Sequence, residues 1–543
     1  MGTLKAYLQA NASSTFALPA LHTVRPTIRW AGPVTSAASA APGSTLPNGV
    51  IFPLTHASIG VPIRNRFSAL SGNPKLNGYP CLGLWRPYIC RGAQRGTGSR
   101  TPLRIKTDAP VIEFTGVVLD NQAALPVLVV DGQLVPPAAF QGSRGDPNGG
   151  WTAGTLVIDF GSRALRDLWI DTSMSLAYIK IDAQDTLLDA NEPGEPQITV
   201  IGDSYLQTRS NTFPFDAAIA MEIGARLGVR KIAVDTIGGT GYYNTNNNLG
   251  NLNDRLPAHA ADNSIVYLVM AGLNDYYDVT GWPTRANYER SVYDYLANLR
   301  AAQPDALIVV TAPMCPEPPK SDTVWVANGA TNTSGLGDYR YKAQVQKNAI
   351  QQIAGPWIYI DVLMGGGWLT SNGAAGDITG LQWFTGGNAG YGQTLGGGGG
   401  FGGVKAIPIV SGGKYSQGPN MTASGGAGQG LLIGGVIDAN GALTSVMVHT
   451  SGDGYTATGL PTITVDPTYE ITPAVLGTPV LTQSFNPGSG ANYPTPASAP
   501  IGATDLNNID RMLSEDRVHP SPVGAAYLGK RLAENLYQAV MAL

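Results

Sequence analysis

Hydrophobic and polar positions follow two different patterns along this chain of 543 residues. Between residues 61 and 195, short apolar runs recur between turn-forming residues, and several of them alternate apolar with polar positions. Such runs are typical of β-strands, and no long helical period interrupts them. We therefore expect a β-sandwich domain over residues 61–195. Its predicted strands cover residues 111–118, 127–135, 155–160, 165–171 and 176–182.

From residue 196 the pattern changes to an apolar strand, a loop and an amphipathic helix, repeated several times. This alternation predicts an α/β domain with a parallel sheet that is covered on both faces, formed by residues 196–363 and 506–543. Ligands bind such sheets beyond the carboxyl ends of the strands. The predicted strands cover residues 197–201, 231–236, 264–270, 306–311 and 357–362, and the predicted helices residues 215–227, 286–302, 340–354 and 523–541.

Two segments follow neither pattern. Residues 1–60 are rich in Ala, Ser, Thr and Pro, and we expect an extended arm that docks on a partner surface. Residues 364–505 form a Gly-rich insertion in which residues 404–415 resemble residues 444–455, with Tyr415 and Tyr455 at matching positions. A repeat of this kind predicts a β-rich unit, and packing is the more common role for such tyrosines, with sugar stacking as the alternative.

Composition excludes several classes of protein. The chain has 38 acidic and 34 basic residues, so it lacks the basic excess of a nucleic-acid-binding protein. Its apolar runs are too short to cross a membrane, and residues near Met1 lack the pattern of a secretory signal. Charged residues make up only 13 %, while Gly contributes 69 residues and Pro 39, which indicates a turn-rich, weakly charged protein.

The three cysteines do not form a disulfide framework, and their spacing fits no zinc site. Cys81 and Cys90 are close enough in sequence to pair, and free packing cysteines are the alternative. We expect no metal and no cofactor.

The first candidate for chemistry is Ser204, in the segment Gly202-Asp203-Ser204 that directly follows the first predicted α/β strand. Taken alone, this tripeptide is better explained by an ordinary turn. A strand-to-helix turn can also hold a serine hydroxyl exposed over the sheet, as nucleophile elbows do.

Two neighbouring strand ends carry candidate hydrogen-bond donors. Residues 237–242 contain Gly239 and Gly241, whose N–H groups can face an anion, and Asn274 follows the third predicted strand. A helix N-cap is the plain alternative for Asn274. The functional alternative is an amide that donates to a developing oxyanion.

A serine nucleophile needs a base, and His519 is the strongest of the five histidines. Asp516 lies three residues before it, at an offset that lets the carboxylate orient the ring. A helix-capping Asp beside an incidental His is the alternative. His259 and His449 have no carboxylate at that offset, so we treat both as bystanders.

These segments, in this order, resemble the four sequence blocks of the SGNH or GDSL-type hydrolase superfamily. The resemblance covers about residues 197–363 and 506–543, and it implies a three-layer α/β/α fold of flavodoxin-like order with ester-hydrolase activity. It makes Ser204 the nucleophile, His519 the base and Asp516 its orienting residue. It also implies an oxyanion hole formed by Ser204, Asn274 and a glycine, for which we favour Gly239 over Gly241.

The region 61–195 resembles the β-sandwich that precedes the catalytic domain in some carbohydrate esterases. The Gly-Tyr-Pro repeats of the insertion resemble those of bacteriophage tail proteins. These resemblances predict an esterase that removes acyl groups, with acetyl as the first choice, from a polysaccharide such as bacterial capsule or O-antigen. The expected setting is a virion or the extracellular space, with other tail proteins as partners of the arm and a homo-oligomer as one assembly.

Two alternatives stay open at the level of sequence. One is a secreted or intracellular esterase that acts on other polymers or on lipids. The other is a virion structural protein or adhesin whose hydrolase site is vestigial.

Overall fold

The computed structural model describes about three fifths of the chain. The described residues are 1–12, 26–34, 44–46, 48–53, 75–76, 79–80, 101–118, 127–135, 139–140, 152–172, 175–188, 190, 194–206, 219–245, 250–260, 264–275, 283–313, 336–362, 367–376, 404–416, 418–438, 440–453, 455–481 and 522–543. All three cysteines and the segment with Asp516 and His519 lie outside these ranges.

The α/β domain contains a seven-stranded sheet of order β15-β14-β16-β17-β18-β19-β20. The first five strands of this order are parallel, and in chain order they read 2-1-3-4-5, which confirms the expected flavodoxin-like arrangement. Their side chains are buried almost throughout, because both faces of the sheet are covered. The strands are β14 (Gln197–Gly202), β15 (Lys231–Thr236), β16 (Val266–Met270), β17 (Leu307–Thr311), β18 (Trp357–Ile360), β19 (Trp368–Thr370) and β20 (Ala375–Gly376).

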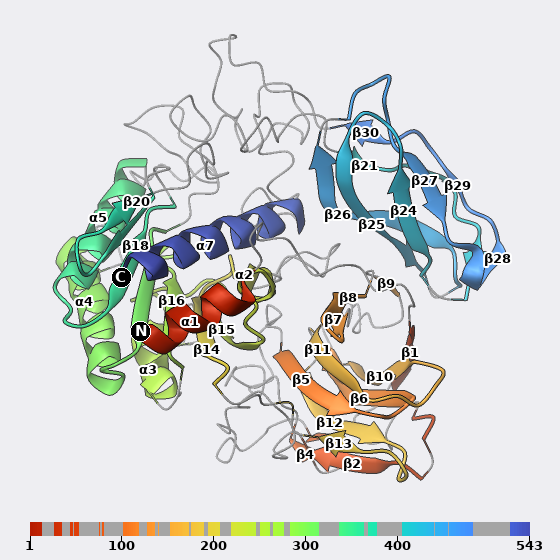
Figure 1. Cartoon of the computed structure of the whole chain (residues 1–543), viewed down its shortest axis with the longest axis horizontal. Helices are drawn as coiled ribbons and strands as arrows, with labels where there is room; N and C mark the ends of the chain where they lie inside the picture. The colour runs from red at the N-terminus through yellow and green to blue at the C-terminus, as the bar shows by residue number, and fades with distance from the viewer. Residues whose placement is uncertain are drawn as a thin grey trace.

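Helices cover this sheet in two groups. One group has α2 packed against α7, and the other has α3, α4 and α5 packed in a row (Figure 1). Right-handed crossovers between parallel strands of this order place the two groups on opposite faces. The helices are α2 (Ile219–Leu227), α3 (Leu252–Ala260), α4 (Arg285–Ala302), α5 (Leu336–Gln351) and α7 (Pro522–Ala542).

The boundary of the insertion differs from the expected residue 364. Strands β19 and β20 continue the sheet of the α/β domain in antiparallel pairing up to Gly376. A tight turn joins them, in which the Gly373 N–H donates to the Thr370 carbonyl at 3.0 Å. Such a short hairpin carries too few apolar residues to be recognised by periodicity.

The N-terminal half contains two five-stranded antiparallel sheets whose inward side chains belong to one buried core. The predicted strand over 127–135 is a hairpin, because Asp131 and Gly132 both have positive φ and form its turn. One sheet has the order β1 (Thr27–Val34), β10 (Thr152–Asp159), β6 (Val111–Val118), β12 (Ser175–Ile181), β2 (Val50–Pro53), and the other has the order β13 (Leu187–Leu188), β5 (Thr101–Thr107), β11 (Arg166–Thr172), β7 (Val127–Val130), β8 (Gln133–Leu134). Strands β3 (Lys75–Leu76) and β4 (Tyr79–Pro80) form a separate pair.

The expected extended arm of residues 1–60 is wrong for the parts that the structure describes. Strands β1 and β2 belong to one of the N-terminal sheets, and the hydroxyls of Ser44 and Thr45 donate to the buried carboxylate of Glu113 in β6. Residues Gly2–Asn11 form the helix α1, which buries Leu4 and Leu8 against the α/β domain. Leu4 and Leu8 lie one helical turn apart, and so share one face.

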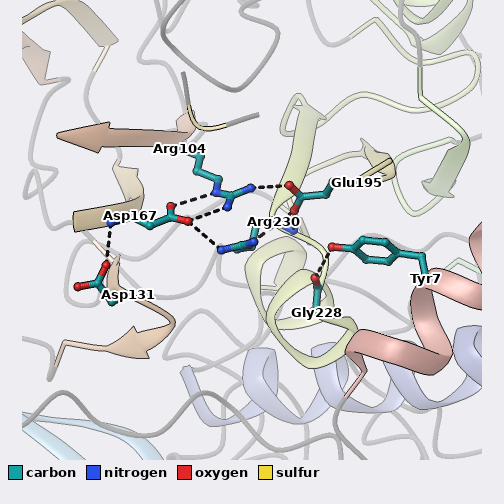
Figure 2. Close-up of polar contacts among 7 residues, drawn as sticks. All are labelled: Tyr7, Arg104, Asp131, Asp167, Glu195, Gly228 and Arg230. Atoms are coloured by element: carbon teal, nitrogen blue, oxygen red, sulfur yellow. Dashed lines mark hydrogen bonds and ion pairs between the residues drawn. The ribbon is translucent and has the colours of Figure 1, made fainter. Parts of the chain in front are cut away.

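Ion pairs join the N-terminal sheets to the α/β domain (Figure 2). Arg104 in β5 is fully buried, and it binds Asp167 of β11 through Nε at 3.1 Å and Nη2 at 2.7 Å. Its Nη1 donates to Glu195, which lies just before β14. Arg230, just before β15, donates to Asp167 at 3.0 Å through Nη1 and to Glu195 at 3.0 Å through its backbone N–H. The Tyr7 hydroxyl of α1 donates to the Gly228 carbonyl nearby.

The insertion forms a β-rich unit with a hydrophobic core of its own. Tyr415 and Tyr455 are both buried in that core, and the Tyr415 hydroxyl accepts the Ala474 N–H at 2.8 Å, so packing accounts for both. Strand β26 packs against α7, and β25 pairs in parallel with β9 (Ala139–Phe140). The strands are β21 (Val404–Ala406), β22 (Ile409–Ser411), β23 (Lys414–Tyr415), β24 (Asn420–Ser424), β25 (Gln429–Ile437), β26 (Leu443–Asp453), β27 (Thr462–Val465), β28 (Glu470–Thr472), β29 (Val475–Leu476) and β30 (Val480–Leu481).

Candidate active site

Ser204 lies in a tight turn at the carboxyl end of β14, and only 5 % of it is exposed. The Leu206 N–H donates to the Asp203 carbonyl at 3.2 Å, which closes the turn. A Cβ at Gly202 would lie 2.3 Å from the Met270 carbonyl oxygen and 2.6 Å from Leu206 Cδ1. Glycine is therefore required at the last position of β14, and it lets the turn approach β16 closely.

Asp203, the residue before the proposed nucleophile, is buried as well. Its Oδ1 accepts the Tyr205 N–H at 3.0 Å. Burial raises the pKa of Asp203 to about 7, and the nearby Asp275 carboxylate acts in the same direction. The Tyr205 N–H and the positive charges of Arg255 and Lys342 oppose this rise.

The ends of β14 and β15 are tied together by Arg255 of α3. Its Nη2 donates to the Gly202 carbonyl at 3.2 Å and to Thr240 Oγ1 at 3.3 Å, while its Nη1 pairs with Asp235 Oδ1 at 3.0 Å. The guanidinium has a planar fork of donors, which lets one side chain hold three separate groups. Arg255 therefore couples the turn that carries Ser204 to the loop that carries Gly239.

That loop meets the end of β16 directly. The side-chain amide of Asn274 donates to the Thr240 carbonyl at 3.1 Å. Gly239 and Gly272 have φ values of 76° and 110°, in the region that favours glycine. The structure therefore brings the Gly239 and Asn274 segments together at the edge of the sheet where Ser204 lies.

The choice between the two candidate glycines is informed by their hydrogen bonds. The Gly241 N–H donates to the Asn244 carbonyl at 3.0 Å, so it is already engaged within the loop. A Cβ at Gly241 would lie 2.3 Å from the Asp275 carboxylate, so this residue faces the interior. Both observations favour Gly239 as the donor.

Asp275 is a residue whose role the sequence did not reveal. It is buried, and its carboxylate accepts the N–H groups of Tyr242, Tyr243 and Asn244 at 2.8, 3.0 and 2.9 Å. Burial raises the pKa of Asp275, against the effect of these three donors. Asp275 thus shapes the loop after β15 through hydrogen bonds to three of its N–H groups.

Two side chains of the helix α5 hold the loop after β16. Gln346 donates to the Ala271 carbonyl at 2.9 Å, and Lys342 donates to the Leu273 carbonyl at 3.5 Å. Both side chains are buried. The main chain that leads to Asn274 is therefore held at two carbonyl groups.

His259 has no carboxylate three residues before it in the sequence, but the fold supplies one. It lies in α3, fully buried, and its Nε2 is hydrogen-bonded to Asp235, so it does have a carboxylate partner, from a distant strand. Its Nδ1 is hydrogen-bonded to the Tyr295 hydroxyl at 3.0 Å. Both ring nitrogens are engaged, which agrees with a structural role. His449 lies in β26 of the insertion.

The predicted base and its orienting residue, His519 and Asp516, lie outside the described residues. The helix α7 begins at Pro522, directly after this segment. Among the described residues, no group of three or more His, Cys, Asp or Glu side chains could hold a metal ion. In the same parts of the chain, no helix combines the length and apolar character needed to cross a membrane.

No family model matches this sequence, and neither does any curated protein. Solved structures do match it. A salicylyl-acyltransferase from a tetracycline biosynthetic pathway is 15 % identical with a TM-score of 0.38, over 58 % of this chain and 85 % of that one. A family two carbohydrate esterase from Clostridium thermocellum is 14 % identical with a TM-score of 0.33, over 49 % and 82 %. A Bacteroides ovatus protein named as GDSL-like is 14 % identical with a TM-score of 0.31, over 56 % and 82 %.

Proposed function

We propose that the protein is a serine esterase of the SGNH type. The observation that carries the proposal is the hydrogen bond between the Asn274 amide and the Thr240 carbonyl, next to Gly239. It joins two predicted donor segments at the edge of the sheet where Ser204 follows β14. A nucleophile between preorganised donors is the arrangement that acyl transfer requires.

In the proposed mechanism, the Ser204 hydroxyl attacks the ester carbonyl and passes its proton to His519, which Asp516 orients. The N–H groups of Ser204 and Gly239 and the side-chain amide of Asn274 donate to the tetrahedral oxyanion. Collapse of this intermediate expels the alcohol, which takes the proton from His519. Water then attacks the acyl-enzyme with His519 as base, and it releases the acid and the free Ser204.

We propose an O-acylated polysaccharide, with acetyl as the acyl group, as the substrate class. Two β-rich units contact the α/β domain, one through β5 and β15 and the other through β26 and α7, and family two carbohydrate esterases are among the solved structures that match the chain. Acetate release from a panel of acetylated glycans tests this substrate, and release from simple lipid esters alone would contradict it. The virion setting stays a prediction, which mass spectrometry of purified virions would check.

The chemistry itself is tested with p-nitrophenyl acetate. We expect Ser204→Ala to abolish hydrolysis without a change in the melting temperature, because a hydroxyl at a turn contributes little to stability. Ser162→Ala, at an exposed turn of the N-terminal sheets, is the matched control and should keep full activity. Equal activity of the Ser204→Ala and wild-type proteins would overturn the mechanism, and a wild-type protein inactive on all esters would favour the adhesin alternative.

A further inference from the structure

Asn244 lies in the loop after β15, between two segments that the proposed mechanism uses. Its side-chain Nδ2 donates to the Gly239 carbonyl and to the Asn274 carbonyl, each at 2.9 Å. These are the main-chain carbonyls of two of the three residues proposed as oxyanion donors. One primary amide therefore joins the two donor segments.

The orientation of this amide is fixed by its partners. Both acceptors are carbonyl oxygens, and only the NH₂ end of an asparagine side chain can donate to them. The flipped amide would place Oδ1 against two carbonyl oxygens and would lose both hydrogen bonds. An aspartate of the same shape, when ionised, has no N–H group and cannot make either hydrogen bond.

The backbone of Asn244 is held as firmly as its side chain. Its N–H donates to Asp275 Oδ1 at 2.9 Å, and its carbonyl accepts the Gly241 N–H at 3.0 Å. Asp275 directly follows Asn274, so both the side chain and the backbone of Asn244 link the loop after β15 to the loop after β16. We call the Asn244 side chain, with its hydrogen bonds to the Gly239 and Asn274 carbonyls, the brace. The main chain that carries this brace is itself held by two hydrogen bonds.

From this geometry we infer that Asn244 is a positioning residue that holds Gly239 and Asn274 at the spacing needed to bind an oxyanion. The inference rests on the proposed esterase function and deepens it. The Asn244 side chain is already engaged by two carbonyls, so it acts through its neighbours and does not touch the substrate. Removal of the amide leaves both donors in place but lets their spacing relax, and a misplacement of about 1 Å can cost on the order of 10²-fold in rate.

The kinetic test compares Asn244→Ala with a matched control on p-nitrophenyl acetate. Asn372→Ala is that control, because Asn372 Nδ2 also bridges two main-chain carbonyls, those of Ala542 and Leu543, at 3.0 and 3.1 Å. We expect Asn244→Ala to lower kcat by about 10- to 100-fold with KM changed less than about threefold, and Asn372→Ala to keep the wild-type kcat. An unchanged kcat for Asn244→Ala would overturn the inference.

A double-mutant cycle with Asn274→Ala separates positioning from general stability. If the brace acts through the oxyanion donors, its removal should lower kcat less in a protein that already lacks one of these donors. We therefore expect Asn244→Ala to cost less than about threefold in the Asn274→Ala background. Equal losses in both backgrounds would show that Asn244 acts elsewhere.

The isosteric variant Asn244→Asp covers the case in which the alanine variant fails to fold. An ionised carboxylate cannot donate to Gly239 or Asn274, whereas a protonated carboxyl can donate one hydrogen bond. The activity of Asn244→Asp relative to wild type should therefore rise as the pH falls. A relative activity that does not change with pH would contradict the brace.

Hydrogen exchange tests the brace without any catalysis. Amides of residues 237–244 should exchange faster in Asn244→Ala than in wild type, and at the wild-type rate in Asn372→Ala. Unchanged exchange in Asn244→Ala would overturn the inference even in an active esterase. Faster exchange in a protein that hydrolyses no ester would instead confirm the brace and refute the proposed function.

Discussion

At the scale of single residues, the buried carboxyl of Asp203 makes stability depend on pH. Its pKa is about 7 in the folded protein and 3.8 in an unperturbed chain, chiefly because burial disfavours the charge. Between these values the folded state binds more protons than the unfolded state, so the contribution of Asp203 to stability falls as the pH rises from about 4 to about 7.

Asn at position 203 keeps an acceptor for the Tyr205 N–H but cannot ionise. We therefore expect Asp203→Asn to gain stability relative to wild type as the pH rises, by about 2 to 4 kcal/mol between pH 4 and pH 8. Urea unfolding at both pH values measures it. Asp108→Asn is a control of opposite sign, because a hydrogen bond from the Thr186 N–H and the charge of Arg163 lower the pKa of Asp108. A gain for Asp203→Asn that is the same at both pH values would contradict the prediction.

The sequence could predict that the candidate site residues lie at strand ends, but not which other residues hold them in place. Ser204, Gly239 and Asn274 follow apolar strands, and strand ends are readable from one-dimensional patterns. The bonds from Asn244 and Arg255 connect positions that only the folded chain brings together. Asp235 offered one signal: a carboxylate within a buried strand needs a partner, and Arg255 and His259 are those partners.

At the scale of elements, the close approach of β14 and β16 depends on a missing side chain. The nearest atom to a Cβ at Gly202 would be a backbone oxygen, which cannot move aside as a flexible side chain can. We expect Gly202→Ala to lower the free energy of unfolding by about 1 to 3 kcal/mol and to impair ester hydrolysis, since the turn with Ser204 must shift. Gly2→Ala, where nothing lies within 4 Å, is the control, and equal stability of the two variants in urea unfolding would refute this explanation.

The elements that the sequence revealed are those with strong periodicity. The helix predicted over 286–302 is α4 (Arg285–Ala302), and the strand predicted over 231–236 is β15 with the same bounds. The helix α3 was missed because Pro257 lies within it and only half of its other residues are apolar, in a helix of nine residues. The helix α1 was missed because Leu4 and Leu8 are stabilised by tertiary packing and form only a short apolar stripe.

At the scale of the whole molecule, the joint between the N-terminal sheets and the α/β domain depends on Arg104 (Figure 2). We expect Arg104→Met to lower the free energy of unfolding by about 3 to 5 kcal/mol, because it leaves Glu195 and Asp167 with fewer positive partners in a buried place. Arg163→Met is the matched control, since the Arg163 side chain is 47 % exposed in its pairs with Asp108 and Asp185, and an ion pair with an exposed guanidinium contributes about 0 to 1 kcal/mol. Urea unfolding measures both, and similar small losses would refute a structural role for the joint.

The arrangement of the three units could not be predicted from the sequence. Composition separated a β-rich region, an α/β domain and a Gly-rich insertion, because each has its own pattern. The contacts between the units depend on single side chains and on two-residue strand pairs, which have no period. The expected arm illustrates this: its prolines and small residues gave no sign that β1 and β2 complete a sheet.

The pairing of β9 with β25 connects the insertion to the N-terminal region, so that each of the three units contacts the other two. The N-terminal sheets contact the α/β domain through Arg104, the α/β domain contacts the insertion through α7 and β26, and the insertion returns to the N-terminal region through β9 (Figure 1). Each of the three units contacts the other two, so none of them can rotate about one contact without disturbing another. A rotation at one of these contacts would therefore strain the other two, so we expect the three units to keep their relative positions.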